Sequence, residues 1–133
     1  MSEIKINDLV QAHYNSGIYI GKVIEDRGNF LLVEVLAVTK HPMQGDLHNR
    51  GEVEGIAFFE RKALAYREKM NARKRTITPY VEKVPEYKDS LKKAIRQFEE
   101  ELLAEETPFH QKSLEKLHSL KKHYYNRIFQ EEL

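Results

Sequence analysis

The most apolar stretch of the chain lies at residues 30–38, where branched and aromatic side chains follow one another almost without interruption. Its odd positions are uniformly apolar, and Glu34 is the only charged residue among its even positions. A strand that is apolar on both sides has both of its faces covered in the folded protein. We therefore expect a core strand here, with the interior of a small sheet on one face and another packed element on the other.

Shorter segments with alternating apolar and polar positions surround this core strand. Residues 9–14 and 18–25 read as strands separated by turn residues, and Gly21 indicates a bend or bulge in the second one. A further strand is predicted at residues 53–60, and a last one is favoured near residues 63–67, where the spacing of apolar residues also fits a helix. Short strands punctuated by Gly and Asn turns are typical of a small antiparallel β-barrel of SH3-like type, with an OB-like barrel as the alternative.

From residue 85 onward the apolar spacing becomes that of helices. Pro85 suits the first turn of one helix, and Thr107 followed by Pro108 suits the start of a second. Because the connection is short, we expect the two helices to form an antiparallel hairpin whose apolar stripes pack on each other and on the core strand. The stripes are Tyr87, Leu91, Ala94, Ile95, Phe98 and Leu102, and then Leu114, Leu117, Leu120, Tyr124 and Ile128.

These patterns together predict an α+β protein with two regions. Residues 1–83 are expected to form the SH3-like barrel with an irregular connector, and residues 84–133 the C-terminal helical hairpin. A chain of 133 residues that is 41% apolar is large enough for one compact domain with such an extension.

The amino-acid composition excludes several kinds of functional site, whereas the net charge excludes none. The 22 basic and 21 acidic residues give a net charge of +1, which favours no class of charged partner. The absence of cysteine excludes disulfides, thiolate metal sites, a cysteine nucleophile and a lipid on cysteine. Residues 1–5 do not resemble a signal peptide, and no segment is long and apolar enough to span a membrane. We therefore expect a cytoplasmic protein with no direct membrane insertion.

The loop that follows the core strand is the first candidate site. Pro42 and Gly45 favour a sharp turn, and Met43 offers an adaptable apolar side chain. The loop also contains residue types that bind metals, but their spacing within one loop is a weak signal and we predict no metal site. We predict instead a partner-binding loop formed by His41, Pro42, Met43, Gln44, Gly45, Asp46 and His48.

A basic stretch at residues 61–75 is the second candidate site. Glu68 is the only acidic residue within it. Basic residues with an interleaved aromatic side chain occur on RNA-binding barrels. The alternative nucleic-acid surface consists of Arg61, Lys62, Tyr66, Arg67, Lys69, Arg73, Lys74 and Arg75. Acidic residues at 99–106 offer a counter-charge within the protein or across subunits, so we favour a solvated or ion-paired stretch over nucleic-acid binding.

The sequence contains no recognisable catalytic constellation. Its six glycines are scattered among turns instead of forming a phosphate-binding loop, and no serine lies in a nucleophile-elbow context. We therefore expect no enzymatic activity, no catalytic residue and no cofactor.

Three segments resemble the kinase-associated protein B family of spore-forming Bacillus-type bacteria. They are residues 37–48, which include the run HPMQGDLH, residues 59–68 and residues 17–21. The resemblance covers nearly the whole chain and implies a β-barrel with a helical extension. It also implies a non-enzymatic accessory that binds and supports a membrane sensor histidine kinase in the sporulation phosphorelay. The family has been described as lipoprotein, but without a cysteine we expect any membrane association to run through the kinase. The helical stripes suggest a homodimer.

Overall fold

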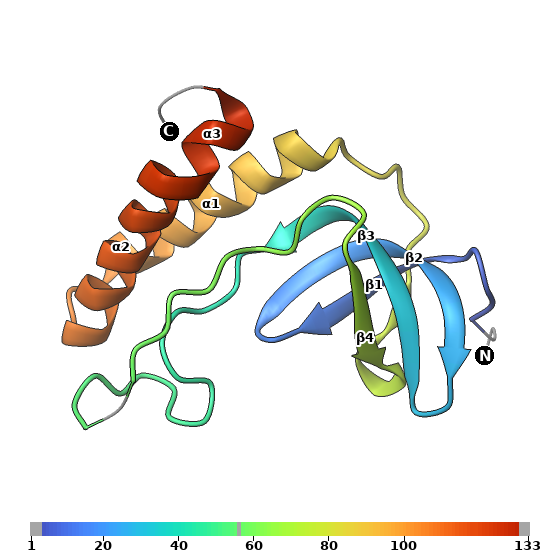
Figure 1. The fold of residues 1–133 in the computed structure, drawn as a ribbon, viewed down its shortest axis with the longest axis horizontal. Helices are drawn as coiled ribbons and strands as arrows, with labels where there is room; N and C mark the ends of the chain where they lie inside the picture. The colour runs from blue at the N-terminus through green and yellow to red at the C-terminus, as the bar shows by residue number, and fades with distance from the viewer. Residues whose placement is uncertain (1–3, 56, 131–133) are drawn as a thin grey trace.

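The structure is a computed structural model that describes residues 4–55 and 57–130. Figure 1 shows a curved sheet beside a pair of long helices, with extended chain between them. The strands are β1 (Leu9–Tyr14), β2 (Gly17–Arg27), β3 (Phe30–Lys40), β4 (Lys69–Arg73) and β5 (Thr78–Pro79). The helices are η1 (Lys74–Thr76), α1 (Tyr87–Ala104), α2 (Pro108–Leu120), the π-helical η2 (Lys121–Tyr125) and α3 (Asn126–Phe129). The predicted α+β class is confirmed.

The five strands form one antiparallel sheet in the order β4-β3-β2-β1-β5. The sheet curls so that β1 and β4 approach each other. The two edge strands, β4 and β5, are not paired with each other, so the described residues form an open sheet. The closed SH3-like barrel is therefore not confirmed. Strand β5 has only two residues, so it has few backbone groups with which to pair with β4 and close the sheet.

The strands predicted at 9–14, 18–25 and 30–38 are confirmed as β1, β2 and β3. The bulge predicted at Gly21 is also confirmed, because the register of β2 against β3 shifts between Ile20 and Gly21. A Cβ at Gly21 would lie 2.5 Å from the backbone oxygen of Glu34. The close approach of the two backbones thus requires glycine at this bend.

The two strands predicted at 53–60 and 63–67 are wrong. The described residues of both segments form no strand, residue 56 lies outside the described part, and the last long strand is instead β4. The reason is tertiary: most side-chain contacts of this segment are with the helices, and only its end at Arg67 bonds to the backbone of β3, at Val35. The ring of Phe58 contacts that of Phe109, and the Ala63 amide donates to the hydroxyl of Tyr125.

The predicted coverage of β3 is confirmed for one face, whereas on the other face the even positions from Phe30 to Leu36 are only half-buried and Val38 is buried. Its odd positions from Leu31 to Ala37 are at most 2% exposed and line the interior of the curled sheet. On the other face α1 packs against β3, and the Val38 amide donates to Ser90 Oγ at 2.9 Å. The residues that α1 buries are Ser90, Leu91, Ala94, Ile95, Phe98 and Leu102. Sheet and helices therefore share one core.

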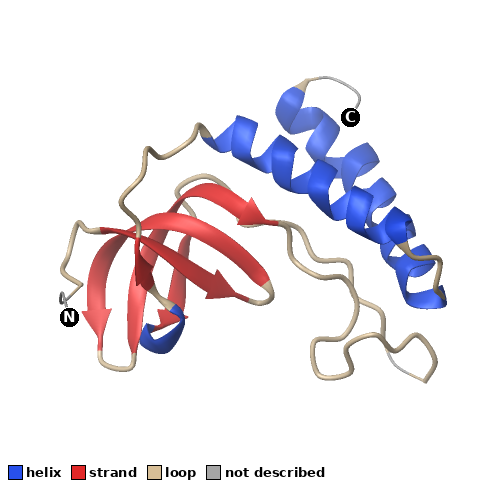
Figure 2. Ribbon diagram, turned by 180° about the vertical axis from the view of Figure 1, so that it is seen from behind, coloured by secondary structure: helices blue, strands red, loops and turns tan. Residues whose placement is uncertain are grey.

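Helices α1 and α2 lie side by side and run in opposite directions (Figures 1 and 2). Thr107 caps α2 by accepting from the His110 amide at 3.0 Å, and Pro108 is its first residue, as predicted. Glu99 of α1 forms an ion pair with Lys121, and its carboxylate lies 3.7 Å from Nε2 of His118. The stripe residues are mostly covered within the chain, so those that are buried are not free to form a homodimer contact.

Candidate interaction surfaces

Three tyrosines from three different elements converge on the backbone of Ala63 and Leu64. The hydroxyl of Tyr125 accepts from the Ala63 amide at 2.9 Å. The hydroxyl of Tyr19 accepts from the Leu64 amide at 3.3 Å, and that of Tyr87 donates to the Leu64 carbonyl. We call this arrangement the 63–64 junction. It ties β2, α1 and η2 to a segment that has no regular hydrogen bonding of its own.

His41, the first residue of the predicted binding loop, is part of the same junction. Its ring stacks on Phe98 with the centroids 4.8 Å apart, and its side chain is buried. Its Nδ1 lies 2.9 Å from the Pro42 carbonyl, an acceptor, so this nitrogen carries the proton. Its Nε2 then accepts from the Tyr125 hydroxyl at 2.7 Å. The polar groups of the junction are thereby satisfied with a neutral imidazole.

Burial keeps these groups in their neutral forms. Desolvation lowers the pKa of His41 to about 4, although the hydrogen bond to Pro42 opposes the shift. Desolvation also raises the pKa of Tyr19 to about 12 and raises the pKa of Tyr87 and Tyr125 above their ordinary value. The tyrosines therefore remain hydroxyls at neutral pH, and each can both donate and accept a hydrogen bond.

Gln44 and Arg61 hold the loop against the returning chain. The Gln44 amide nitrogen donates to the Arg61 carbonyl at 2.8 Å, and its oxygen accepts from the Arg61 amide at 2.8 Å. The Arg61 guanidinium in turn donates to the carbonyls of Met43 and Gly45 at 2.6 and 3.1 Å. Four hydrogen bonds thus join two segments that have no regular secondary structure.

The predicted partner-binding loop is therefore divided by the structure. The side chains of His41, Pro42 and Gln44 are buried, as is Gly45, so these four residues are not a contact surface and hold the fold together instead. Met43 and Asp46 are half-buried, and His48 is exposed. Partner binding through this loop stays a prediction that only these last three side chains can carry.

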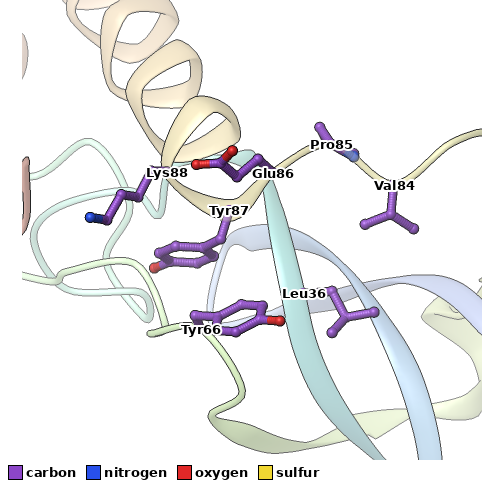
Figure 3. Close-up of a pocket in the computed structure, with 7 residues that line it drawn as sticks. All are labelled: Leu36, Tyr66, Val84, Pro85, Glu86, Tyr87 and Lys88. Atoms are coloured by element: carbon purple, nitrogen blue, oxygen red, sulfur yellow. The ribbon is translucent and has the colours of Figure 1, made fainter.

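An apolar groove lies where the sheet meets the start of α1 (Figure 3). It has a volume of about 540 Å³ and is lined by Leu36, Tyr66, Val84, Pro85, Glu86, Tyr87 and Lys88. The rings of Tyr66 and Tyr87 lie one above the other with their centroids 5.8 Å apart. Tyr66 is 55% exposed, one of the most exposed large apolar side chains in the described chain. We call this feature the tyrosine groove.

The sequence assigned the groove residues to other roles. Tyr87 belonged to a helical stripe, Pro85 to a helix start and Leu36 to the covered face of the core strand. Tyr66 belongs to the alternative nucleic-acid surface. No spacing signal connects residues 36, 66 and 84–88, so only the folded chain could bring them together.

The basic residues of the alternative nucleic-acid surface do not form one patch. Arg61 is used by the loop carbonyls, and the Lys62 ammonium lies over the Tyr124 ring at 4.3 Å. Arg67 lies 3.7 Å from Glu34, and Lys74 pairs with Asp26 at 2.9 Å. The remaining cations, Lys69, Arg73 and Arg75, are exposed on β4 and η1. Nucleic-acid binding stays an untested alternative, but it has no continuous track of free cations here.

The described residues contain neither a cluster of metal ligands nor a membrane-spanning helix. Within residues 4–55 and 57–130, no three His, Asp or Glu side chains lie close enough together to hold a metal ion. None of the helices in this part of the chain is both long and apolar enough to cross a lipid bilayer.

These features define a small α+β protein in which an open sheet and a pair of helices share one core and leave an aromatic groove at their seam. Residues 14–125 match the family model described as "Kinase associated protein B". The chain therefore belongs to the kinase-associated protein B family, and the resemblance seen in the sequence is confirmed.

Two relatives give the same result. The chain is 39% identical over 127 residues to "Kinase-associated lipoprotein B" of Bacillus subtilis (strain 168), with 96% of this chain and 99% of the relative covered. The crystal structure of kinase-associated protein B from Bacillus cereus superposes with a TM-score of 0.78 at 35% identity, covering 92% of this chain and 99% of that one. The Bacillus subtilis relative is called a lipoprotein, whereas the 133 residues printed here contain no cysteine.

Proposed function

We propose that this protein is a non-enzymatic accessory of a membrane sensor histidine kinase, which it binds and supports within the sporulation phosphorelay. The observation that carries the proposal is membership of a family named for association with a kinase, over nearly the full length of the chain. In this proposal the protein acts in the cytoplasm and reaches the membrane surface only through its kinase.

The tyrosine groove is the surface that we assign to the kinase. Aromatic side chains supply much of the binding energy of protein interfaces, because they bury a large area at small entropic cost. Tyr66 exposes more than half of its surface, while the hydroxyl of Tyr87 is anchored on Leu64. A partner would therefore meet a preorganised ring pair, with Glu86 and Lys88 at the rim for polar contacts.

Binding of the cytoplasmic region of a sensor histidine kinase, measured by calorimetry, tests this assignment. Replacement of Tyr66 by Ala removes a central aromatic contact and should weaken binding at least about tenfold. Phe59 offers a matched control, because it is 54% exposed and lies outside the groove. Phe59→Ala should leave the affinity nearly unchanged.

Two results would contradict this account at different levels. If Tyr66→Ala and Phe59→Ala bind the kinase as tightly as the unmodified protein, the groove is not the contact surface. If the unmodified protein binds no sensor kinase cytoplasmic region, the accessory function itself is wrong.

The loop at residues 41–48 provides a second, separable surface. Met43 and His48 can be replaced together by Ala without disturbing the buried His41 and Gln44. Weaker kinase binding with an unchanged melting temperature would assign the loop to the interface. Unchanged affinity would leave the loop with its structural role alone.

A further inference from the structure

A second groove lies on the curled sheet, between the end of β1 and the strand β4. It has a volume of about 390 Å³ and is lined by residues from β1, the β1–β2 turn, β3, β4, η1 and the loop at residue 50. Strand β5 pairs with β1 only at Val10 and Gln11. Beyond Gln11 that edge of β1 has no ladder partner in the described structure, so the groove coincides with the unclosed part of the sheet.

The charge of this groove has one sign. Arg50 and Arg73 line it, and none of its nine lining residues is acidic. The carboxylates at the nearby end of β2 are already used, because Glu25 pairs with Arg27 and Asp26 pairs with Lys74. The groove therefore presents cationic donors without an internal counter-charge. We call it the basic groove.

The guanidinium of Arg73 contacts an aromatic ring but is not neutralised by a carboxylate. It lies over the Phe30 ring, 5.3 Å from the centroid, and forms no ion pair within the described residues. Arg50 donates only its Nε, to the Leu47 carbonyl at 3.3 Å, which leaves the outer guanidinium nitrogens available. Planar guanidinium groups bind carboxylates through two parallel hydrogen bonds.

From this arrangement we propose that the basic groove binds an acidic, extended segment of a protein partner. Carboxylates of the segment pair with Arg50 and Arg73, and the unpaired edge of β1 offers main-chain groups to an extended chain. The proposal rests on the proposed function in one respect only, namely that the partner is a protein. It adds the chemistry that the partner must present.

The same groove is poorly built for single-stranded nucleic acid. Nucleic-acid recognition by small β-barrels depends on exposed ring faces on which bases stack. Here one face of Phe30 is covered by Arg73, and Tyr14 is half-buried. The other cations of residues 61–75 are dispersed or paired, so a longer strand would find no continuous phosphate track.

Fluorescence anisotropy of the full-length chain with a labelled peptide of alternating Glu and Gly, at low salt, tests the proposal. The unmodified protein should bind this peptide and not the matched peptide with Gln in place of Glu. The double variant Arg50→Gln, Arg73→Gln should bind about tenfold more weakly. The control variant Lys69→Gln, Arg75→Gln has the same change of charge outside the groove and should bind within about twofold of the unmodified protein. All four residues are exposed, so circular dichroism should show the same folded state for both variants.

Several outcomes would overturn the proposal. One is the absence of peptide binding, and another is an equal loss of affinity in both double variants, which would mean non-specific attraction. A third is tighter, Arg73-dependent binding of a labelled single-stranded RNA, which would assign the groove to nucleic acid. The kinase measurement with Tyr66→Ala is independent of these results, so failure of the basic groove leaves the proposed function standing.

Discussion

The 63–64 junction and the tyrosine groove are built from the same kind of residue but differ in what covers them. Tyr125 in the junction is 0% exposed and satisfies both His41 and Ala63. Tyr66 in the groove is 55% exposed and contacts only one other ring, that of Tyr87. Tyr87 belongs to both, because its hydroxyl binds Leu64 while its ring lines the groove.

Tyrosines have two different roles in this fold, and the sequence alone does not distinguish them. A buried tyrosine with a satisfied hydroxyl stabilises the fold, whereas an exposed ring beside it is available to a partner. The run at 41–48 carries the family resemblance most specifically. Its residues His41, Pro42, Gln44 and Gly45 are buried, so they stabilise the fold.

Replacement of His41 by Ala should be the most destabilising change in the junction. It removes the ring stacked on Phe98, leaves a cavity and deprives the Tyr125 hydroxyl of its acceptor. The free energy of unfolding should fall by about 2–5 kcal/mol, as measured by urea denaturation. His48→Ala, in the same loop but exposed, should change it by less than about 0.5 kcal/mol. Similar values for both variants would show that the loop is not part of the core.

The stability of the protein should fall as the pH is lowered from neutral toward 4. Burial lowers the pKa of His41 to about 4 in the folded state, whereas in the unfolded chain it is near the ordinary value of 6.5. The unfolded state therefore binds this proton first, so the contribution is complete above pH 6.5 and is lost as the pH falls through the folded pKa. The contribution is about 3 kcal/mol.

Comparison with a variant isolates this histidine from the carboxylates that titrate over the same pH range. His41→Gln keeps an oxygen that can accept from Tyr125 but does not titrate. Urea denaturation at a series of pH values should show a steeper loss of stability between pH 6.5 and 4 in the unmodified protein than in His41→Gln. Parallel curves would mean that His41 does not resist protonation.

Tyr125→Phe tests the hydroxyl of the junction without changing its packing volume. The substitution leaves the buried Ala63 amide without its acceptor and His41 Nε2 without its donor. The free energy of unfolding should fall by about 1–3 kcal/mol, which thermal or urea unfolding can detect. The neighbouring Tyr124→Phe is the control. Its ring is half-buried under Lys62, so the loss should be smaller.

Tyr66→Ala should affect stability less than the substitutions of His41 and Tyr125 in the junction. Its ring is mostly exposed and touches Tyr87, so the free energy of unfolding should change by less than about 1 kcal/mol. The same variant is expected to lose kinase affinity. A large destabilisation would show that the groove, like the junction, is primarily structural.

Local patterns were sufficient for most of the regular elements. The alternation at residues 9–14 and the continuous apolar run at 30–38 correspond to β1 and β3, and Thr107 with Pro108 begins α2 as predicted. These signals depend on residues that are close in sequence. The strands predicted at 53–60 and 63–67 fail because apolar residues in a short segment do not specify whether a sheet or a helix covers them.

Tyr125 shows how a local irregularity changes which side chain faces inward. A regular helical spacing from Leu117 and Leu120 predicts Tyr124 on the apolar stripe. In the structure residues 121–125 form a π-helix, whose backbone hydrogen bonds span one more residue than those of the predicted α-helix. Tyr125 is therefore fully buried and Tyr124 only half-buried. The spacing of apolar residues does not predict a π-helical turn, so the sequence does not identify Tyr125 as the central residue of the junction.

The sequence by itself determined the α+β class, the core strand, the positions of the two helices and the family, because each depends on neighbouring residues or on a contiguous motif. The burial of four residues of the HPMQGDLH run, and the meeting of Leu36, Tyr66 and Tyr87 in one groove, follow from the folded chain alone. The physical reason is that burial and convergence depend on which distant segments meet, and periodicity along the chain holds no information about that choice.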